Sequence, residues 1–165
     1  MASELRVAGV VSLAQNAPVK LGKTQIQKLV YFAQALGVPF DYKYEIYHYG
    51  PYSFELSHDL NALNSRGVLS VKSDPTGFGY EISAGKFAEK FKLETKYQKK
   101  IEAILDKIGR NTPAELEVKA TIHFVKSIVK KNKSDVIPKV HALKPRFTEE
   151  FIERCYSHLQ QLKWI

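Results

Sequence analysis

The fold is decided by residues 23–53, which read KTQIQKLVYFAQALGVPFDYKYEIYHYGPYS. In the first half, apolar residues recur at helical spacing: Ile26, Leu29, Val30, Ala33 and Leu36. Tyr31 and Phe32 widen this face, and Gly37 supplies a helix stop. A helix that is apolar on most sides lies inside a domain. The sequence therefore predicts a central core helix over residues 23–36.

An aromatic segment follows the core helix. Alternating Tyr and Ile positions predict a short strand over residues 42–49, which Gly50-Pro51 ends. Two interpretations of its rings remain open: they pack over the core helix, or some of them face a protein partner, because tyrosine gives a large contact area with a polar tip. The rings are Tyr42, Tyr44, Tyr47, Tyr49, Tyr52 and Phe54. The predicted partner-binding residues are Tyr47, Tyr49, Gly50, Pro51 and Tyr52.

The core helix and the aromatic segment together resemble a known family. Residues 27–34, followed by an aromatic segment and Gly50-Pro51, are similar to the Panacea (SocA-like) antitoxin domain, and in particular to its stand-alone YwgA-like branch. The family often has a small apolar residue after Gly-Pro, where this chain has Tyr52-Ser53, so the subfamily stays open. The matching positions are Gln27, Lys28, Leu29, Tyr31, Gln34, Gly50 and Pro51.

This resemblance implies a function. It implies a non-enzymatic protein that neutralises a cognate toxin by direct contact, or delivers it to a protease as an adaptor. It also implies that Leu29 and Tyr31 are structural, and that the Gly50-Pro51 corner with its aromatic flank lies nearer the partner.

The length and the cysteine count bound the class of protein. A chain of 165 residues can bury enough surface to fold without a disulfide or metal. The single Cys155 fits a reducing cytoplasm. No apolar run reaches the length of a membrane span, and the apolar stretch over residues 7–14 is interpreted as a buried first helix, not a signal peptide.

Helix-capping residues and turn-forming Gly, Pro, Asn and Asp residues predict the remaining elements. A helix over residues 3–15 precedes the core helix, and a helix capped by Ser53 with a hairpin over residues 68–82 follows the aromatic segment. This order is that of a winged helix-turn-helix. We therefore expect a mainly α fold with a small β-hairpin, in which a winged-helix-like core over residues 1–83 is followed by C-terminal helices over residues 84–165. The helices either pack on the core to give one compact domain or form a separate helical part.

The C-terminal part is expected to contain several helices. A long helix is predicted over residues 84–108, with a kink or break near Leu93 left open. Thr112-Pro113-Ala114-Glu115 starts the next helix, with Leu116, Ala120, Phe124 (or His123) and Ile128 inside. Ser134 is predicted to cap a short helix through Leu143, and Thr148 the last helix.

The net charge of +8 lies entirely after residue 82, because residues 1–82 hold equal numbers of acidic and basic residues. Two interpretations remain open for the C-terminal lysines: a solvated face, or a surface for an acidic partner. The predicted electrostatic surface is Lys126, Lys130, Lys131 and Lys133, within a group that continues to Lys139, Lys144 and Arg146.

The alternative function is a winged-helix nucleic-acid-binding regulator. Its recognition helix would be the helix over residues 54–66, which offers His58, Asn61, Asn64 and Arg66. This helix carries little excess positive charge with which to bind phosphates.

Catalytic chemistry has weak support in the sequence. The five histidines show no metal-ligand spacing, and Gly77-Phe78-Gly79 is not a phosphate loop. Cys155 and His158 are one helical turn apart, which permits a thiolate pair, but a structural Cys155 is the favoured interpretation. We therefore expect no enzyme activity, cofactor or metal.

Overall fold

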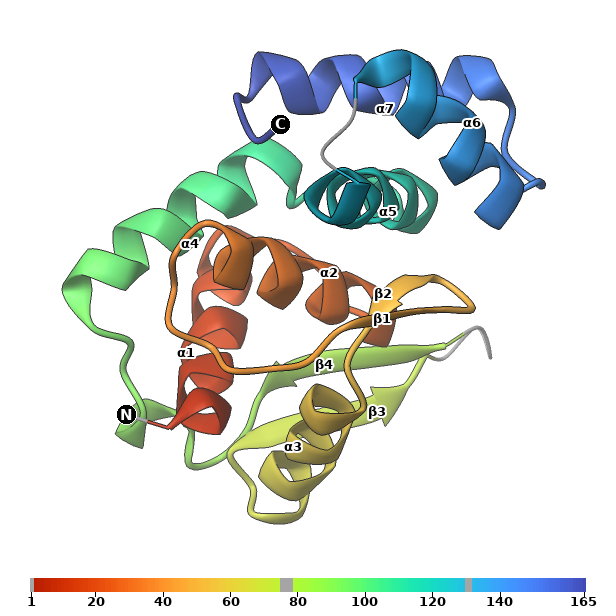
Figure 1. Cartoon of the computed structure of the whole chain (residues 1–165). Helices are drawn as coiled ribbons and strands as arrows, with labels where there is room; N and C mark the ends of the chain where they lie inside the picture. The colour runs from red at the N-terminus through yellow and green to blue at the C-terminus, as the bar shows by residue number, and fades with distance from the viewer. Residues whose placement is uncertain (1, 75–78, 130–131) are drawn as a thin grey trace.

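The computed structural model describes residues 2–74, 79–129 and 132–165 (Figure 1). Helices dominate it, and the strands form two antiparallel hairpins. This confirms the mainly helical fold and adds a second hairpin to the predicted one. The elements in chain order are α1 (Ser3–Asn16), α2 (Lys23–Ala35), β1 (Glu45–Tyr47), β2 (Gly50–Tyr52), α3 (Phe54–Ser65), β3 (Leu69–Ser73), β4 (Tyr80–Ala84), the 3-10 turn η1 (Ala88–Lys90), α4 (Thr95–Ile108), α5 (Pro113–Val129), α6 (Lys133–Leu143) and α7 (Glu149–Gln161).

Helix α2 is the core helix that the sequence predicted. Its residues are buried without interruption from Ile26 to Ala33. The start is fixed by Gln25, whose side-chain oxygen accepts a hydrogen bond from the Gly22 N–H at 3.0 Å. Gly37, at φ +96°, follows the C-terminal end. Since α1, α4 and α5 all pack against α2, the elements of both halves of the chain meet on this helix.

The predicted strand over residues 42–49 is a hairpin instead. β1 and β2 pair antiparallel with Tyr47 opposite Gly50, so His48 and Tyr49 form the turn. Gly50 and Pro51 therefore begin a strand and do not end one. Gly50 has a φ of +86°, which glycine adopts without the strain that a Cβ would bring. Strands of three residues are too short for a period-two pattern to reveal the turn between them.

The elements after the hairpin follow the prediction. The Ser53 hydroxyl accepts a hydrogen bond from the Leu56 N–H at 3.2 Å, and Leu56, Leu60 and Leu63 form the buried edge of α3. β3 and β4 then pair from Leu69 opposite Ala84 to Ser73 opposite Tyr80. The predicted turn of this hairpin, including Gly77-Phe78, lies outside the described residues. The winged-helix interpretation rests on this order of α1, α2, α3, β3 and β4.

The predicted helix over residues 84–108 is wrong in its first half. β4 extends to Ala84, and α4 begins only at Thr95. Between them the chain follows the surface of earlier elements: a Cβ on Gly9 of α1 would come within 2.9 Å of the Leu93 Cβ, and one on Gly67 within 3.1 Å of the Phe87 ring. These contacts bury Leu93 in an extended segment, so tertiary packing overrides local helix propensity here.

The C-terminal helices start largely where the sequence predicted. Thr112 and Glu115 form a reciprocal capping box, each side chain accepting from the other residue's N–H at 3.1 Å. The Thr148 hydroxyl caps α7 by accepting from the Phe151 N–H at 3.2 Å. The predicted cap of α6 is wrong, because the N-cap position is Asn132 and Ser134 lies within the helix.

Helices α5 and α7 pack together at one end of the molecule, above α2 in Figure 1. The Tyr31 hydroxyl lies 2.8 Å from His123 Nδ1 of α5, and the rings of Phe32 and Trp164 lie 5.1 Å apart. Both parts of the chain thus contribute to one hydrophobic core. The division at residue 84 stays a prediction. In the described part of the chain, every helix is too short or too polar to cross a membrane.

Candidate protein-interaction site

Three aromatic rings contact one another on the outer side of the β1–β2 hairpin and the start of α3, and a fourth exposed ring lies in the hairpin turn. We call Tyr47, Tyr49, Tyr52 and Phe54 the aromatic patch. Tyr47 is 43 % exposed, Tyr49 59 % and Phe54 53 %, whereas Tyr52 is half-buried. The rings of Tyr47, Tyr52 and Phe54 lie 5.0–5.5 Å apart. Exposed aromatic rings in contact with one another form a preorganised apolar surface of the kind found at protein interfaces.

The other members of the aromatic segment are interior residues. Tyr42 is buried, and its hydroxyl donates a hydrogen bond of 2.7 Å to Asp59. Tyr44 lies edge-on against Tyr31 of α2, with ring centroids 5.1 Å apart. Burial raises the pKa of both the Tyr42 and Tyr44 hydroxyls above the usual value of 10.0. Packing over the core helix therefore holds for Tyr42 and Tyr44, whereas partner contact by the exposed rings stays a prediction.

Gly50 and Pro51 are buried, unlike the three tyrosines predicted with them. A Cβ on Gly50 would come within 2.8 Å of the Thr121 Oγ1 and 3.1 Å of the Glu117 carbonyl oxygen. This close approach of the backbone to α5 requires glycine. The Gly-Pro corner therefore fixes the hairpin on the protein interior, and partner contact at Tyr47, Tyr49 and Tyr52 stays a prediction.

The two glutamines of the family motif hold the ends of the aromatic segment. The Gln27 side-chain amide donates to the Ser53 carbonyl and accepts from the Ser53 N–H, both at 2.9 Å. The Gln34 amide makes the same pair of bonds to Tyr42, at 2.9 and 3.0 Å. Each side-chain amide thus bonds to both the N–H and the carbonyl of one residue, as a neighbouring strand would. The aromatic segment is therefore attached to α2 at both ends.

Lys28, which follows Gln27 in the motif, is fully buried. Its Nζ donates a 2.7 Å hydrogen bond to the Pro51 carbonyl. Burial lowers the pKa of Lys28 from 10.5 to about 8; the nearby Glu117 opposes this effect and Lys144 adds to it. The other two motif positions, Leu29 and Tyr31, are also buried.

A second buried lysine reaches the hairpin from the C-terminal half. Lys144 Nζ donates to the carbonyls of Tyr47 and His48 at 2.9 and 2.8 Å. It also lies 3.2 Å from a carboxylate oxygen of Glu117, whose other oxygen accepts a hydrogen bond from Arg146. Since a buried charge needs paired, hydrogen-bonded partners, this arrangement ties the tip of the hairpin to α5 and to the end of α6.

The sequence missed this role of Lys144, Glu117 and Arg146. Lys144 was grouped with lysines expected to form a solvated face or a surface for an acidic partner, but it is buried. Glu117 and Lys119 of α5 are also buried, although charged side chains on a helix are usually exposed to solvent. The only sequence signal was the position of Lys144 between Leu143 and Pro145, which does not distinguish a buried lysine from an exposed one.

The predicted electrostatic surface is described only in part. Lys126 and Lys133 lie with their Nζ atoms 6.0 and 5.8 Å from the centre of the Tyr156 ring. Lys130 and Lys131 lie outside the described residues. Lys126 and Lys133 therefore belong to the α5–α7 side of the molecule, and not to the aromatic patch.

A second apolar surface lies at the end of α5. Ile128, predicted to lie inside, is 65 % exposed. It lines an apolar groove of about 410 Å³ together with Ile46, Phe124, Val125, Val129, Lys139, Ala142 and Leu143. Ile46 is the neighbour of Tyr47 in β1, and neighbouring strand residues point to opposite faces. The groove and the aromatic patch thus lie on opposite faces of the hairpin.

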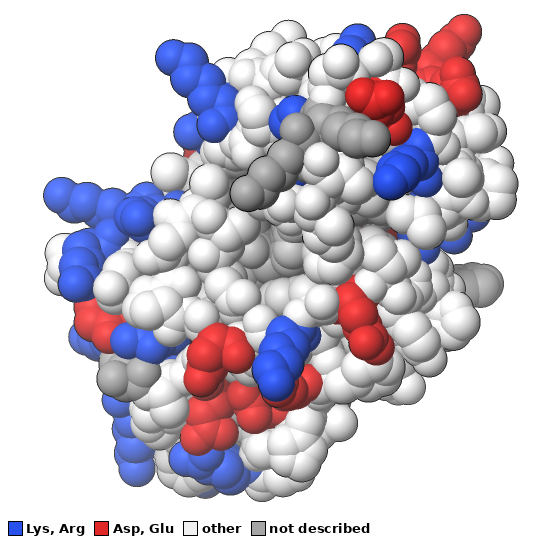
Figure 2. Space-filling model, viewed as in Figure 1, with Lys and Arg blue, Asp and Glu red and all other residues white. Residues whose placement is uncertain are grey.

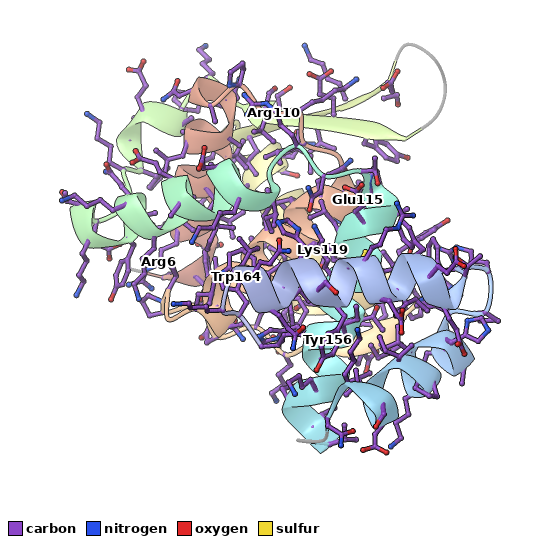
Figure 3. The ribbon with its side chains drawn as sticks, turned by 90° about the horizontal axis from the view of Figure 1, so that it is seen from above. Arg6, Arg110, Glu115, Lys119, Tyr156 and Trp164 are labelled. Atoms are coloured by element: carbon purple, nitrogen blue, oxygen red, sulfur yellow. The ribbon has the colours of Figure 1, made fainter. Side chains whose placement is uncertain are left out.

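Cys155 does not form the reactive pair that its spacing to His158 permitted. It is buried, and burial raises the pKa of its thiol from 9.0 to about 11, so the thiol is protonated at neutral pH. His158 instead contacts Lys119 Nζ, which also donates a 2.6 Å hydrogen bond to Asn111. Figure 3 shows Lys119 and Glu115 of α5 beside α7. Burial lowers the pKa of Lys119 and of His158.

The predicted recognition helix α3 uses two of its four candidate residues within the protein. Arg66 forms an ion pair with Glu4 at 3.2 Å, and the Asn64 side chain accepts from the Val71 N–H at 3.0 Å. His58 is exposed. Because these two side chains are bonded within the protein, fewer polar groups of this region are free to contact DNA bases or phosphates.

Comparison with known proteins gives one informative similarity. No protein-family model matches the chain. The sequence is 24 % identical over 148 residues to YwgA of Bacillus subtilis (strain 168), an uncharacterized protein, and the match covers 88 % of this chain and 89 % of YwgA. The chain is therefore similar to YwgA over nearly the full length of both proteins.

Proposed function

We propose that this chain is a non-enzymatic protein-interaction module that binds a cognate protein partner through the aromatic patch, as an antitoxin or a proteolytic adaptor does. The observation that carries the proposal is the construction of the hairpin. Buried Gln27, Lys28 and Lys144 hold its backbone, while Tyr47 and Tyr49 on the same hairpin remain exposed. A rigid support beneath exposed tyrosines is what a preorganised binding surface needs, because little side-chain or loop entropy is then lost on binding.

The resemblance to Panacea antitoxins supports a protein partner, either a cognate toxin or a substrate that is delivered to a protease. Its motif positions Gln27, Lys28 and Gln34 are the side chains that attach the aromatic segment to α2. The motif and the segment therefore form one structural unit. The similarity to YwgA is compatible with the stand-alone branch of that family.

The test is partner capture with matched variants. Tagged protein is used to capture partners from a lysate of its native host, with and without nuclease, and captured proteins are quantified by mass spectrometry. We expect the double variant Tyr47→Ala/Tyr49→Ala to lose a stoichiometric partner by about tenfold or more, because truncated aromatic hot spots cost about 1.4 kcal/mol or more. The control is Tyr80→Ala, since Tyr80 is similarly exposed at 47 % but lies in β4.

Two results would contradict the proposal. Equal capture by the double variant and the wild type would remove the aromatic patch from the interface. A large fall in the melting temperature of the double variant would assign the two tyrosines to the core. Joint expression with the product of a neighbouring gene for a small toxic protein would then separate an antitoxin, which restores growth, from other binders.

The second candidate is a nucleic-acid-binding regulator. The observation in its favour is the β3–β4 hairpin directly after α3, with Leu21 forming a further antiparallel bridge to Ile82. Fluorescence anisotropy with labelled duplex DNA tests it, because neutralising several phosphates gives a steep fall of affinity with salt. Nucleic acid in the captured material that is lost at high salt would favour this candidate over the protein-binding module.

A further inference from the structure

The aromatic patch is bordered by carboxylates. Glu45 lies opposite Tyr52 in the β1–β2 ladder, so its side chain lies on the same face as that of Tyr52. Glu55 follows Phe54 in the chain, and its carboxylate accepts a 3.0 Å hydrogen bond from the Lys43 N–H. Both glutamates are exposed. Two carboxylates therefore border the rings on the side of the segment that precedes β1.

The charge of this region opposes that of the rest of the chain. Residues 41–59 contain four acidic residues and one lysine, a net charge of −3, in a chain of net charge +8. Figure 2 shows acidic side chains gathered below the middle of one face, in the region where Figure 1 places α3 and the segment before β1. The local acidity therefore lies on α3 and the segment before β1, and of its four carboxylates Glu45 and Glu55 are the ones that adjoin the patch.

Two basic residues approach the patch from the C-terminal half and are already engaged, whereas Lys43 is exposed on the segment before β1. Lys144 is buried and bonds to the hairpin carbonyls, and Arg146 is paired with Glu117. The Arg146 guanidinium also lies 5.7 Å from the centre of the Tyr49 ring. The protein thus already binds one of its own guanidinium groups with a carboxylate and a tyrosine ring.

From these contacts we infer that the partner presents a basic surface, rich in arginine or lysine, to the aromatic patch, an inference that rests on the proposed function. Tyrosine rings attract cations through their faces, and carboxylates pair with guanidinium groups in a bidentate geometry. A patch of exposed tyrosines beside Glu45 and Glu55 offers both kinds of contact. The same carboxylates repel phosphate groups, which disfavours a nucleic-acid partner at this surface.

The inference is tested with an oligoarginine peptide as the probe. The peptide is titrated into ¹⁵N-labelled protein, and amide shifts are followed at an ionic strength of about 0.01 M and again at about 0.15 M, where the Debye length has fallen from roughly 30 to 8 Å. We expect shifts concentrated in residues 43–55 that weaken at the higher ionic strength. The variant Glu45→Gln/Glu55→Gln should weaken binding by about threefold to tenfold, while its glutamine oxygens preserve the hydrogen-bond acceptor for Lys43.

A matched control excludes a general charge effect. Glu102 and Glu153 are exposed acids on α4 and α7, so Glu102→Gln/Glu153→Gln removes the same charge far from the patch in the sequence. Equal weakening by the two double variants, or shifts spread over all acidic surfaces, would overturn the inference. Stronger shifts of residues 43–55 with oligouridine than with oligoarginine would overturn it in favour of a nucleic acid.

The proposed function is judged by different data. If the probe fails to bind at residues 43–55 but Tyr47→Ala/Tyr49→Ala loses the captured partner, the patch binds a protein that is not basic. If the probe binds there as expected but the tyrosine variants still capture the partner, the patch has the inferred chemistry but is not the interface of that partner.

Discussion

Lys28 gives a quantitative test of how the hairpin is held. The ammonium group lies fully buried on a backbone carbonyl, and its pKa is lowered from 10.5 to about 8. The unfolded chain therefore binds more protons than the folded chain between about pH 8 and 10.5, and stability rises with pH wherever this is so. The substitution Lys28→Met removes the titrating group and keeps a side chain of similar length.

The size of the effect follows from the difference between the two pKa values. One pKa unit corresponds to about 1.4 kcal/mol, so the whole difference is worth roughly 3 kcal/mol. Between about pH 7.5 and 9.5, we expect the free energy of unfolding of the wild type to rise by roughly 2 kcal/mol relative to Lys28→Met. Below pH 7.5 the difference between the two proteins should be nearly constant, because Lys28 is then charged in both the folded and the unfolded state.

Urea unfolding followed by circular dichroism at several pH values measures this difference. Comparing the two proteins cancels other groups that titrate in the same range. The most important is Cys155, whose raised pKa has the opposite sign: the unfolded thiol ionises near pH 9 and the folded one near pH 11, so it lowers stability as the pH rises. A pH-independent difference between wild type and Lys28→Met would refute the reasoning. A difference that falls with pH would show that pairing with Glu117 outweighs desolvation.

Three further predictions follow from the same contacts. Gly50→Ala should destabilise the protein by about 1–3 kcal/mol in urea unfolding, because φ is +86° and the new Cβ would meet Thr121 at 2.8 Å; an unchanged midpoint would mean that the hairpin shifts freely. Glu117→Gln should lower the free energy of unfolding by about 3–5 kcal/mol at neutral pH, because it leaves Lys144 buried without its counter-charge, and a stability equal to the wild type would exclude a structural role for the pair. Cys155 should react with iodoacetamide at pH 8 only as fast as the protein opens, since the thiol is buried and protonated; reaction at the rate of a free cysteine in the native state would contradict this.

The fold was predictable where local signals agreed with tertiary packing. The apolar face of α2, the caps at Ser53, Thr112 and Thr148, and the β3–β4 hairpin all combine a residue preference with the contact that it makes in the structure. Helix propensity failed before α4, because the burial of Leu93 against α1 depends on a contact more than eighty residues away in sequence. The local pattern left a break near Leu93 open, and the chain is not helical there, but no pattern within residues 84–94 identifies the distant contact.

The candidate site was predictable in part of its exposed residues and not in its support. The closely spaced tyrosines left core packing and partner contact both open, and Tyr47 and Tyr49 are exposed. Which tyrosines turn inward depends on the register of a hairpin that three-residue strands do not reveal. Lys144 resembled its solvated neighbours because burial of a lysine is decided by its distant partners, here Glu117 and two carbonyls of the hairpin.

The way the hairpin is held has a consequence for how binding specificity can diverge. Gln27, Gln34, Lys28 and Lys144 all bond to main-chain atoms of the aromatic segment, and none of these bonds uses its side chains. Any residue has the same main-chain atoms, so the tip at residues 47–49 can accept new side chains without loss of its attachment. A scaffold of this design can exchange one recognition sequence for another while the frame that presents it stays fixed, much as an antibody framework carries interchangeable loops.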